Sequence, residues 1–465
     1  FATNEPYGVH NLPEWARLSW RATADDPRTT QYPLRHLERG VVHDPLWSAC
    51  QRSLLRHGEL HNNVRMTWGK ALPFWTADLE QSVAWGQHLN DKYALDGRDP
   101  SSVVGVQWCH GLFDRPFHPP APILGLVRQR DPRTHMSRLD MDRYRAFTDL
   151  PASSTEHPIV VIGAGLAGAT AARLLADHGF DVVVLDKGRR VGGRTSRRRV
   201  DEVVVTHGAP RLDTWPDWMT AWADAEIKAE RLTTLHEGFA LVDGPEVITS
   251  WLDGIDVVTG TTITRLEQDG DVWLIHDEDG NQWRASGVVA TAPLPQLHRM
   301  LPEGPASWAS HPYEPTWTVV LAHQKGSPAS LRSGLEALGL NVEASEDPNG
   351  VVVHLPTQWS REHLEMERTD VGSAFLAMIE GLEETALTWV KTATLQAHRW
   401  RFGRASSLGE RARLPRLVEA GDAWCEPVGT GGAALRSGAW AAAEIAWQCS
   451  QEHRPKPAPV QQTLF

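Results

Sequence analysis

Hydrophobic positions divide this chain into two parts that follow different periods. In the first part, apolar and aromatic residues recur at helical spacing through residues 47–55, 60–75 and 79–89, as in amphipathic helices. The run RPFHPPAP interrupts this pattern, and we expect an extended loop there because proline lacks the amide donor that a helix needs. No stretch of this part alternates convincingly as a strand would. The pattern therefore predicts a helical domain over residues 1–147.

The second part begins with a strand, a helix and another strand in close succession. Residues 159–162 are a short apolar run, residues 166–177 repeat with helical period, and residues 182–185 are apolar again. Further along, residues 271–276 and 282–290 flank an Asp-Gly-Asn turn, which predicts a β-hairpin. Strands that alternate with helices indicate an α/β domain with a parallel sheet.

Composition marks the boundaries of these parts. The segment TDLPASSTEHP between them is rich in proline, serine and threonine, which predicts a linker over residues 148–157. The end of the chain, residues 451–465, is rich in proline and glutamine, and we expect it to be disordered. The fold class expected is multidomain, with a helical domain followed by an α/β domain over residues 158–450.

Charge and cysteine content narrow the function classes. The formal net charge is −12, and the excess of acid lies after residue 150, where 28 basic residues face 41 acidic ones. This excess argues against nucleic-acid binding by the second part, whereas the first part is nearly neutral and stays open. The four cysteines lie far apart, so we expect neither a disulfide framework nor a metal site. No apolar run is long enough for a membrane span, and we expect a cytoplasmic protein.

Three glycines after the first strand carry the clearest chemical signal. Gly163, Gly165 and Gly168 form a Gly-x-Gly-x-x-Gly loop between a strand and a helix. They serve a tight turn, close approach of the backbone to a pyrophosphate and close packing of helix on strand. Asp186 ends the second strand, where its carboxylate can accept hydrogen bonds from ribose hydroxyls. The sequence therefore predicts a dinucleotide site.

The residues that follow resemble a known flavoprotein family. The run DKGRRVGGR is similar to the pattern of FAD-binding amine-oxidase-like flavoproteins, in particular their renalase branch, and the tripeptide HGA that starts at His207 resembles theirs. The resemblance implies a Rossmann-type FAD domain with an inserted β-rich substrate domain. It implies that four residues of this run hold the pyrophosphate and ribityl chain: Arg189, Gly192, Gly193 and Arg194.

Two later stretches extend this resemblance. The glycine-rich segment around Asp422 and Gly432 resembles the family's closing motif, in which an aspartate binds the ribityl chain and a helix start faces the flavin. The stretch His398-Arg399-Trp400 resembles one that lies beside the flavin, which makes these three residues candidates for catalysis. The alternative is that they are ordinary strand residues under the flavin ring. The implied reductant is a small molecule, either an amine or a reduced or isomeric nicotinamide nucleotide, with NAD(P)H as one candidate.

The first part resembles a second flavoprotein family. Residues 60–100, together with the later stretches GVQW and DRP, are similar to the carboxy-terminal part of class II cyclobutane-pyrimidine-dimer photolyases. That part carries half of a helical FAD domain. The resemblance implies that Arg65 and Asp96 form an ion pair that clamps a flavin and that Asn90 faces its N5 atom.

The same resemblance assigns an electron relay and a DNA contact. Trp47, Trp68 and Trp75 fall at the spacing of the family's tryptophan relay, which passes an electron inward to photoexcited flavin. Met66 and Trp108 would line the pocket that receives a flipped pyrimidine dimer from UV-damaged DNA. The alternative for the tryptophans is a purely structural role, because the chain holds 21 of them.

Several departures from the photolyase pattern leave the function of the first part open. Thr67 and Phe117 stand where the family has tyrosine and tryptophan, and the antenna domain and first half of the FAD domain are missing. We therefore expect an N-terminal truncation or a remnant with another use. The leading hypothesis is an FAD-dependent oxidoreductase fused to a photolyase fragment. The alternatives are light-driven repair of pyrimidine dimers, with the oxidoreductase as an accessory and a second FAD in an intact photolyase domain, and a non-catalytic helical scaffold.

Overall fold

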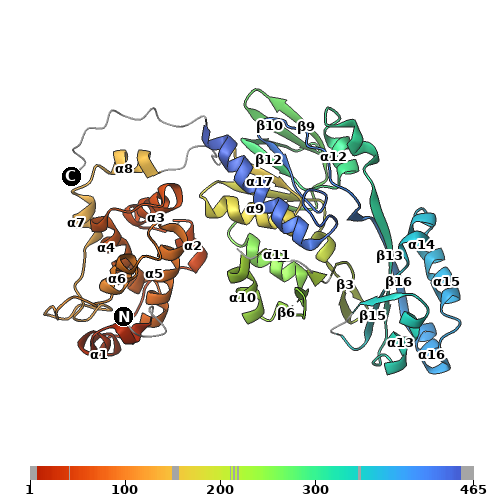
Figure 1. The fold of residues 1–465 in the computed structure, drawn as a ribbon, viewed down its shortest axis with the longest axis horizontal. Helices are drawn as coiled ribbons and strands as arrows, with labels where there is room; N and C mark the ends of the chain where they lie inside the picture. The colour runs from red at the N-terminus through yellow and green to blue at the C-terminus, as the bar shows by residue number, and fades with distance from the viewer. Residues whose placement is uncertain are drawn as a thin grey trace. The chain divides into compact units, whose positions relative to one another are not determined.

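The chain folds into an N-terminal helical unit and a C-terminal α/β unit, with the boundary near Pro151 (Figure 1). The computed structural model describes residues 8–40, 42–148, 157–209, 211–212, 215–216, 219–343 and 347–451. Most of the predicted linker and tail, at 149–156 and 452–465, lies outside the described residues.

The N-terminal unit is helical, as the sequence pattern predicts. The predicted helix over residues 60–75 is shorter than expected, because it ends at Ala71 and Pro73 leads the chain into a 3-10 turn over Leu72–Phe74. The proline-rich run is a loop, as predicted. The helices are α1 (Glu14–Ala22), α2 (Leu34–Glu38), α3 (Pro45–His57), α4 (Asn62–Ala71), α5 (Leu79–Tyr93), α6 (Pro100–Cys109), α7 (Pro132–Met136) and α8 (Met141–Thr148).

The main core of this unit lies between α3, α4 and α5. Its fully buried side chains include Trp68, Leu46, Leu72 and Leu89. Aspartates start both α3 and α5, where their side chains accept hydrogen bonds from backbone amides of the first turn. This packing fixes the rotational setting of α4, which carries Arg65, Met66 and Trp68 of the residues that the photolyase resemblance singles out.

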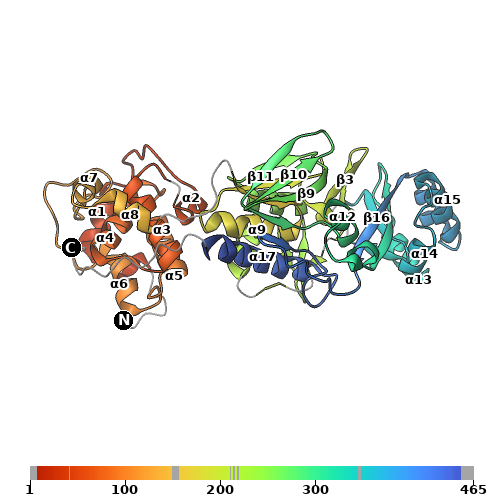
Figure 2. The same cartoon turned by 90° about the horizontal axis from the view of Figure 1, so that it is seen from above.

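Five parallel strands form the central sheet of the C-terminal unit. Their order is β17 (Leu417–Glu419), β12 (Gly287–Ala290), β1 (Ile159–Ile162), β2 (Val182–Asp186) and β8 (Asp256–Thr259). Strand β1 is buried along its whole length between β12 and β2, as its continuous apolar run predicts. Helices α9 (Leu166–Asp177) and α17 (Gly431–Gln451) lie side by side along this sheet (Figure 2).

The predicted hairpin exists, but its second strand is shorter than expected. Strands β9 (Ile263–Asp269), β10 (Val272–Asp277) and β11 (Gln282–Ala285) form a separate antiparallel sheet. The single strand expected over residues 282–290 is wrong, because the chain leaves the hairpin at Ser286 and continues as β12 in the parallel sheet. The side chains of β12 are all buried, so its apolar run belongs between two covered faces.

The C-terminal unit also contains a four-stranded antiparallel sheet with a core of its own. Its order is β14 (Asn341–Glu343), β15 (Gly350–His354), β13 (Tyr313–Ala322) and β16 (Thr394–Ala405). One face of this sheet packs against four helices through an apolar core around Trp317 and Phe375. The helices are α13 (Ala329–Ala337), α14 (Thr357–Glu362), α15 (Arg368–Met378) and α16 (Glu384–Thr392). On the other face, valines of β13 and β15 pack against the hairpin of β3 (Arg197–Val200) and β4 (Val203–Thr206).

The remaining elements complete the C-terminal unit. They are β5 (Arg211–Leu212), α10 (Thr220–Lys228), β6 (Leu232–Thr234), β7 (Phe239–Leu241), α11 (Gly244–Leu252) and α12 (Leu294–Met300). Within the described part of the chain, no helix has both the length and the hydrophobicity to cross a membrane. No cluster of histidine, cysteine or carboxylate side chains there could hold a metal ion.

Candidate cofactor and substrate site

The three glycines of the dinucleotide loop meet three different surroundings. Gly163 has a positive φ of 106°, and a Cβ atom there would lie 2.2 Å from the hydroxyl oxygen of Thr291. A Cβ atom at Gly168 would lie 1.8 Å from the carbonyl oxygen of Gly163. A Cβ atom at Gly165 would meet nothing within 4 Å. Two glycines are therefore required by the fold, whereas Gly165 leaves open space that a ligand can approach.

Asp186 closes this loop from the neighbouring strand. Its Oδ2 atom accepts a hydrogen bond of 2.6 Å from the amide of Ala164, and its Oδ1 atom accepts one of 2.6 Å from the amide of Gly188. The carboxylate is thus fixed at the carboxyl end of β2, next to the loop, as the motif predicts. Each oxygen keeps a second lone pair for a ribose hydroxyl.

The second glycine pair lies directly on the first loop. The amide of Gly192 donates a 2.8 Å hydrogen bond to the carbonyl of Ala164, and a Cβ atom at Gly193 would lie 3.3 Å from the Cα of Gly165. Arg189 lies exposed in the segment between Asp186 and these glycines. The two glycine-rich segments therefore form one backbone surface, which suits a pyrophosphate better than either segment alone.

Arg194 and Asp422 bind each other, although 228 residues separate them in the chain. Two hydrogen bonds of 2.8 Å join the guanidinium and the carboxylate, and the amide of Ala405 donates a third bond to Asp422. The side chain of Asp422 is 6% exposed and that of Arg194 is 33% exposed. Burial raises the pKa of Asp422, but the charge and hydrogen bonds of Arg194 outweigh this and hold the pKa below its usual range. The predicted ribityl contact is thus a buried ion pair in this structure.

Hydrogen bonds hold the start of α17 next to the Arg194–Asp422 ion pair. Ser437 accepts a hydrogen bond from the amide of Gly421 and donates one to its carbonyl, which ties the loop before Asp422 to the helix. Gly432 lies in the first turn of α17, which the hydroxyl of Thr430 caps. The partial positive charge of this helix start is available to an electron-rich ligand.

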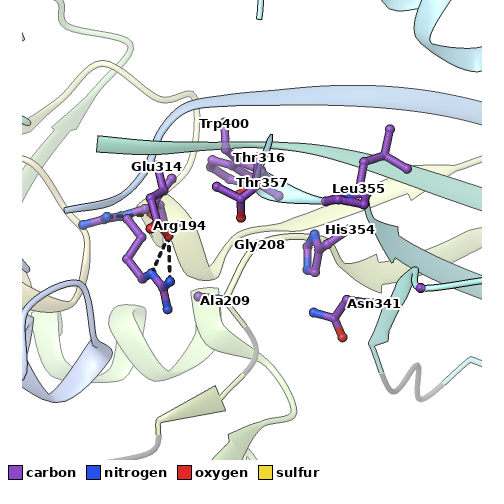
Figure 3. A pocket seen from close by; sticks show the side chains of 14 residues that line it. Arg194, Gly208, Ala209, Glu314, Thr316, Asn341, His354, Leu355, Thr357 and Trp400 are labelled. Carbon is purple, nitrogen blue, oxygen red and sulfur yellow. Dashed lines mark hydrogen bonds and ion pairs between the residues drawn. The ribbon is translucent and has the colours of Figure 1, made fainter. Parts of the chain in front are cut away.

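A cavity of about 370 Å³ opens next to Arg194. Figure 3 shows Arg194 and Glu314 at one end and His354 and Asn341 at the other, with Trp400 in the wall between them. Glu314 forms a salt bridge with Arg404, and Arg194 forms one with Asp422. The charged side chains at the Arg194 end of the cavity are therefore paired. The remaining lining includes backbone of Gly208 and hydroxyls of two threonines: Thr316 and Thr357.

Of the three consecutive residues predicted for catalysis, only Trp400 lines this cavity. His398 shares a sheet face with Trp400, because alternate residues of a strand point the same way, and their rings are 4.4 Å apart. Arg399 points to the opposite face, where it donates hydrogen bonds to the carbonyl of Leu364 and the carboxylate of Glu365. Arg399 is therefore not part of the site, contrary to the expectation from the sequence.

His207 joins these two side chains in a cluster of three rings. Its ring centroid lies 4.8 Å from that of His398 and 5.1 Å from that of Trp400, and its carbonyl accepts a hydrogen bond from the Trp400 indole. Arg198 contacts Nδ1 of His398 at 3.1 Å. Because arginine only donates hydrogen bonds, this nitrogen must accept, and His398 carries its proton on Nε2. Burial lowers the pKa of His207 to about 3 and that of His398 to about 4.

These two histidines should make the C-terminal unit sensitive to acid. Their pKa values in the folded state lie below the ordinary value of 6.5, so the unfolded chain takes up protons first as the pH falls. Their contribution is fully present above pH 6.5 and is lost progressively as the pH falls toward 3, by roughly 3 kcal/mol for each histidine in the free energy of unfolding at pH 4. Urea unfolding at several pH values measures this, and His207→Gln with His398→Gln should flatten the slope. A slope that stays unchanged would assign the effect to other groups.

In the N-terminal unit, Arg65 and Asp96 form the predicted ion pair. Two hydrogen bonds of 2.9 Å join them, and Arg65 also donates to the hydroxyl of Ser102. Asn90 is only 1% exposed, and its amide donates to Ser102 and to the carbonyl of Gly97. The amide of Asn90 therefore holds the loop after α5 and does not face open space, which differs from the predicted contact with a flavin.

The three tryptophans of the predicted relay contact one another. Trp47 stacks on Trp68 with ring centroids 6.0 Å apart and meets Trp75 edge-on at 5.3 Å. Trp68 is buried, whereas the ring of Trp75 also contacts half-buried Tyr32 and exposed His43. The three rings thus form a continuous path from the core of the unit toward its surface.

The two residues predicted to receive a DNA lesion differ in exposure. Met66 is half-buried, with its sulfur 3.9 Å from that of Cys109. Trp108 is 42% exposed, its indole donates a hydrogen bond to Asp114, and its ring meets Phe113 edge-on. An exposed indole held in one orientation can stack on a base.

Comparison with known proteins gives separate matches for the two units. The family model of NAD(P)-binding Rossmann-like domains matches residues 161–225. The N-terminal region is similar to the deoxyribodipyrimidine photo-lyase of Methanothermobacter thermautotrophicus, at 38% identity over 133 residues, which are 29% of this chain and 30% of that protein. The L-amino-acid oxidase of Sistrurus catenatus edwardsii is 40% identical over 69 residues, 15% of this chain and 13% of the oxidase.

A solved structure of a putrescine oxidase variant is also similar, at 13% identity and a TM-score of 0.45, and covers 62% of this chain and 98% of its own. The chain spans less than a third of the curated relatives it matches. The family model and the sequence relatives agree with both resemblances seen in the sequence: a photolyase-like N-terminal region and an amine-oxidase-like flavoprotein region built on a Rossmann core.

Proposed function

We propose that the C-terminal unit is an FAD-dependent oxidoreductase that oxidises a small molecule, either an amine or a reduced or isomeric nicotinamide nucleotide. The observation that carries this proposal is the convergence of two glycine-rich segments, Asp186 and the Arg194–Asp422 pair next to a cavity. The similarity to an L-amino-acid oxidase supports it. In this proposal the sheet of β13 to β16 is the substrate domain, because it supplies half of the cavity lining.

The residues around the loop suit an FAD. The open space at Gly165 and the start of α9 would hold the pyrophosphate, and Asp186 would accept hydrogen bonds from the ribose. A bound flavin supplies the hydride acceptor, while the protein binds and orients the donor.

The cavity residues would position that donor. Trp400 offers a flat apolar wall, and Thr316, Asn341 and Thr357 offer hydrogen-bond partners. His354 lies at the far end, where its Nδ1 atom is 2.8 Å from the hydroxyl of Thr318. Because the charged side chains around the cavity are paired, we expect it to select its substrate by shape and hydrogen bonding more than by net charge.

The FAD content of the purified chain tests this function first. We expect one FAD per chain, bleached anaerobically in the dark by either an amine or a reduced nicotinamide nucleotide. Absorbance of the flavin against protein concentration, before and after each donor, gives both answers. No bound flavin after reconstitution with FAD would contradict the assignment, and bleaching by one donor class would name the substrate.

A second candidate function concerns the N-terminal unit. The tryptophan path and the Arg65–Asp96 pair favour light-driven electron transfer for repair of pyrimidine dimers in DNA, with the oxidoreductase as an accessory. Two FAD per chain, together with loss of dimers from irradiated DNA under blue light, would support this function. One FAD per chain with intact dimers would favour a helical scaffold instead.

A further inference from the structure

Arg198 is a charged residue on the inward face of a strand. It points to the same side of β3 as Val200, because alternate residues of a strand share a face, and Val200 packs on β13 and β15. The Nε atom of Arg198 donates a 2.9 Å hydrogen bond to the side-chain carbonyl of Gln396, and Nη1 contacts Nδ1 of His398 at 3.1 Å. Three of the five N–H groups of this guanidinium are therefore left for a ligand.

The partners of Arg198 are neutral side chains. No carboxylate of the described residues forms a salt bridge with it, whereas the preceding residue, Arg197, forms one with Asp243. Burial and then the charge of Arg368 lower the pKa of Arg198. An arginine that neutral groups hold in place keeps its full charge for a ligand.

Arg368 is a second cation near the same site. It is the first residue of α15, a helix that packs on β16, and its side chain is exposed. Glu367 and Asp370 are close to it in the chain, but neither forms a salt bridge with it in the part of the chain that the structure describes. Burial, and then the charges of Arg198 and Arg368, lower the pKa of His398 to about 4. Two cations that act on one ring without an acid between them are a site for an anion.

His207 adds a buried nitrogen to this group. The residue is 5% exposed, its ring centroid lies 4.8 Å from that of His398, and its Nδ1 atom has no hydrogen-bond partner among the described residues. Buried polar atoms normally have a partner. This nitrogen is therefore a further contact available to a ligand beside His398, which distinguishes the group from a solvated patch of arginines.

We propose that Arg198, Arg368 and His398 form a binding site for a phosphate group. The two guanidiniums match the charge of a phosphate group, about −1.5 to −2 near neutral pH, better than the single charge of a carboxylate. Guanidinium groups also suit the geometry of phosphate oxygens. The three residues come from β3, α15 and β16, so the site exists only in the folded domain, and it needs no bound flavin.

This phosphate site lies next to the cavity of the C-terminal unit. Trp400 lines that cavity, and its ring is 4.4 Å from that of His398. The phosphate group therefore has two possible sources: inorganic phosphate, or the phosphate end of an electron donor that occupies the cavity. The second source rests on the oxidoreductase function proposed above.

Titration calorimetry with inorganic phosphate is the first test. The chain is loaded with FAD beforehand, so that the glycine-rich loop does not compete for phosphate, and the ionic strength is kept constant. Wild type should bind phosphate saturably and acetate more weakly. Arg368→Gln should weaken phosphate binding about tenfold, because one charged partner is lost. Equal phosphate affinity in wild type and Arg368→Gln would overturn the proposal.

Arg361→Gln is the matched control. Arg361 is an exposed arginine of α14 with no salt bridge among the described residues, so this variant loses the same charge elsewhere on the domain. It should bind phosphate as wild type does. An equal loss of affinity in Arg361→Gln and Arg368→Gln would reduce the effect to net charge and overturn the site.

The ring of His398 reports where the phosphate binds. Its NMR signals, assigned by their loss in His398→Gln, should shift when phosphate is added to wild type. Arg198→Gln, with folding checked by circular dichroism, should abolish this shift. Phosphate binding that leaves the His398 signals unchanged would locate the anion elsewhere and overturn the proposal.

Anaerobic reduction of the flavin separates the two sources. If the phosphate group belongs to the donor, inorganic phosphate should raise the donor concentration needed for half-maximal reduction in wild type but not in Arg368→Gln. If the anion is free phosphate, reduction should stay unchanged although calorimetry detects binding. Both results support the site. A chain that binds no flavin would contradict the oxidoreductase function, whereas calorimetry and the His398 signals would still decide the phosphate site.

Discussion

Alanine at position 165 should leave the flavin-free chain as stable as wild type, whereas alanine at position 168 should destabilise it severely. A methyl group at Gly165 meets no atom within 4 Å, but one at Gly168 would lie 1.8 Å from the carbonyl oxygen of Gly163. Relief of that overlap requires α9 to move from β1, at a cost of about 3 kcal/mol or more. Urea unfolding of the flavin-free proteins measures both values.

We also expect the Gly165→Ala variant to bind FAD more weakly than wild type, although it folds. Gly165→Ala should fold but bind FAD at least about tenfold more weakly, because its methyl group occupies the space through which a pyrophosphate approaches the backbone. Flavin titration of the folded variant gives this affinity. Normal FAD affinity in Gly165→Ala would show that the cofactor does not lie against this loop.

Removal of the carboxylate of Asp422 should have the largest effect of any single side chain at the site. Asp422→Ala breaks two hydrogen bonds to Arg194 and one to the amide of Ala405 and leaves a two-thirds buried guanidinium without its partner. Loss of a partly buried ion pair of this geometry should lower the free energy of unfolding by about 2–4 kcal/mol. The FAD content should fall with it, because the loop before α17 loses its anchor.

An exposed pair provides the matched control. Asp269 bonds Arg284 on the hairpin of β9 to β11, and both side chains are about half exposed. Asp269→Ala should change the free energy of unfolding by less than about 1 kcal/mol and leave FAD binding intact. If both variants lost similar amounts of stability and of bound FAD, the anchoring role of Asp422 at the cofactor site would be contradicted.

The sequence predicts the dinucleotide loop well because its signals are local. The glycine spacing, the strand before it and the helix after it all lie within residues 159–186, and the structure has β1 and α9 at the predicted residues. The end of the hairpin at Ser286 is harder to predict from the sequence. Only the pairing of β12 with β1 shows that the apolar run after Ser286 belongs to another sheet.

The cavity lining depends on contacts between distant segments. Thr316 pairs with Trp400 across β13 and β16, and His354 comes from a third strand. No local pattern marks these residues, so the sequence did not predict Thr316 or His354. Strand alternation alone separates Arg399 from His398 and Trp400, because consecutive residues of a strand point to opposite faces of a sheet.

The Arg194–Asp422 pair also has a consequence for the order of events during synthesis. The ribosome completes the first glycine-rich loop more than 200 residues before it reaches Asp422. Until then β12 lacks its outer neighbour β17, and the loop lacks both its ionic anchor and the start of α17. A nascent chain that stops before β17 therefore has the sequence motif for a dinucleotide but not the completed site, and the cofactor can be locked in only after β17 and the start of α17 have been made.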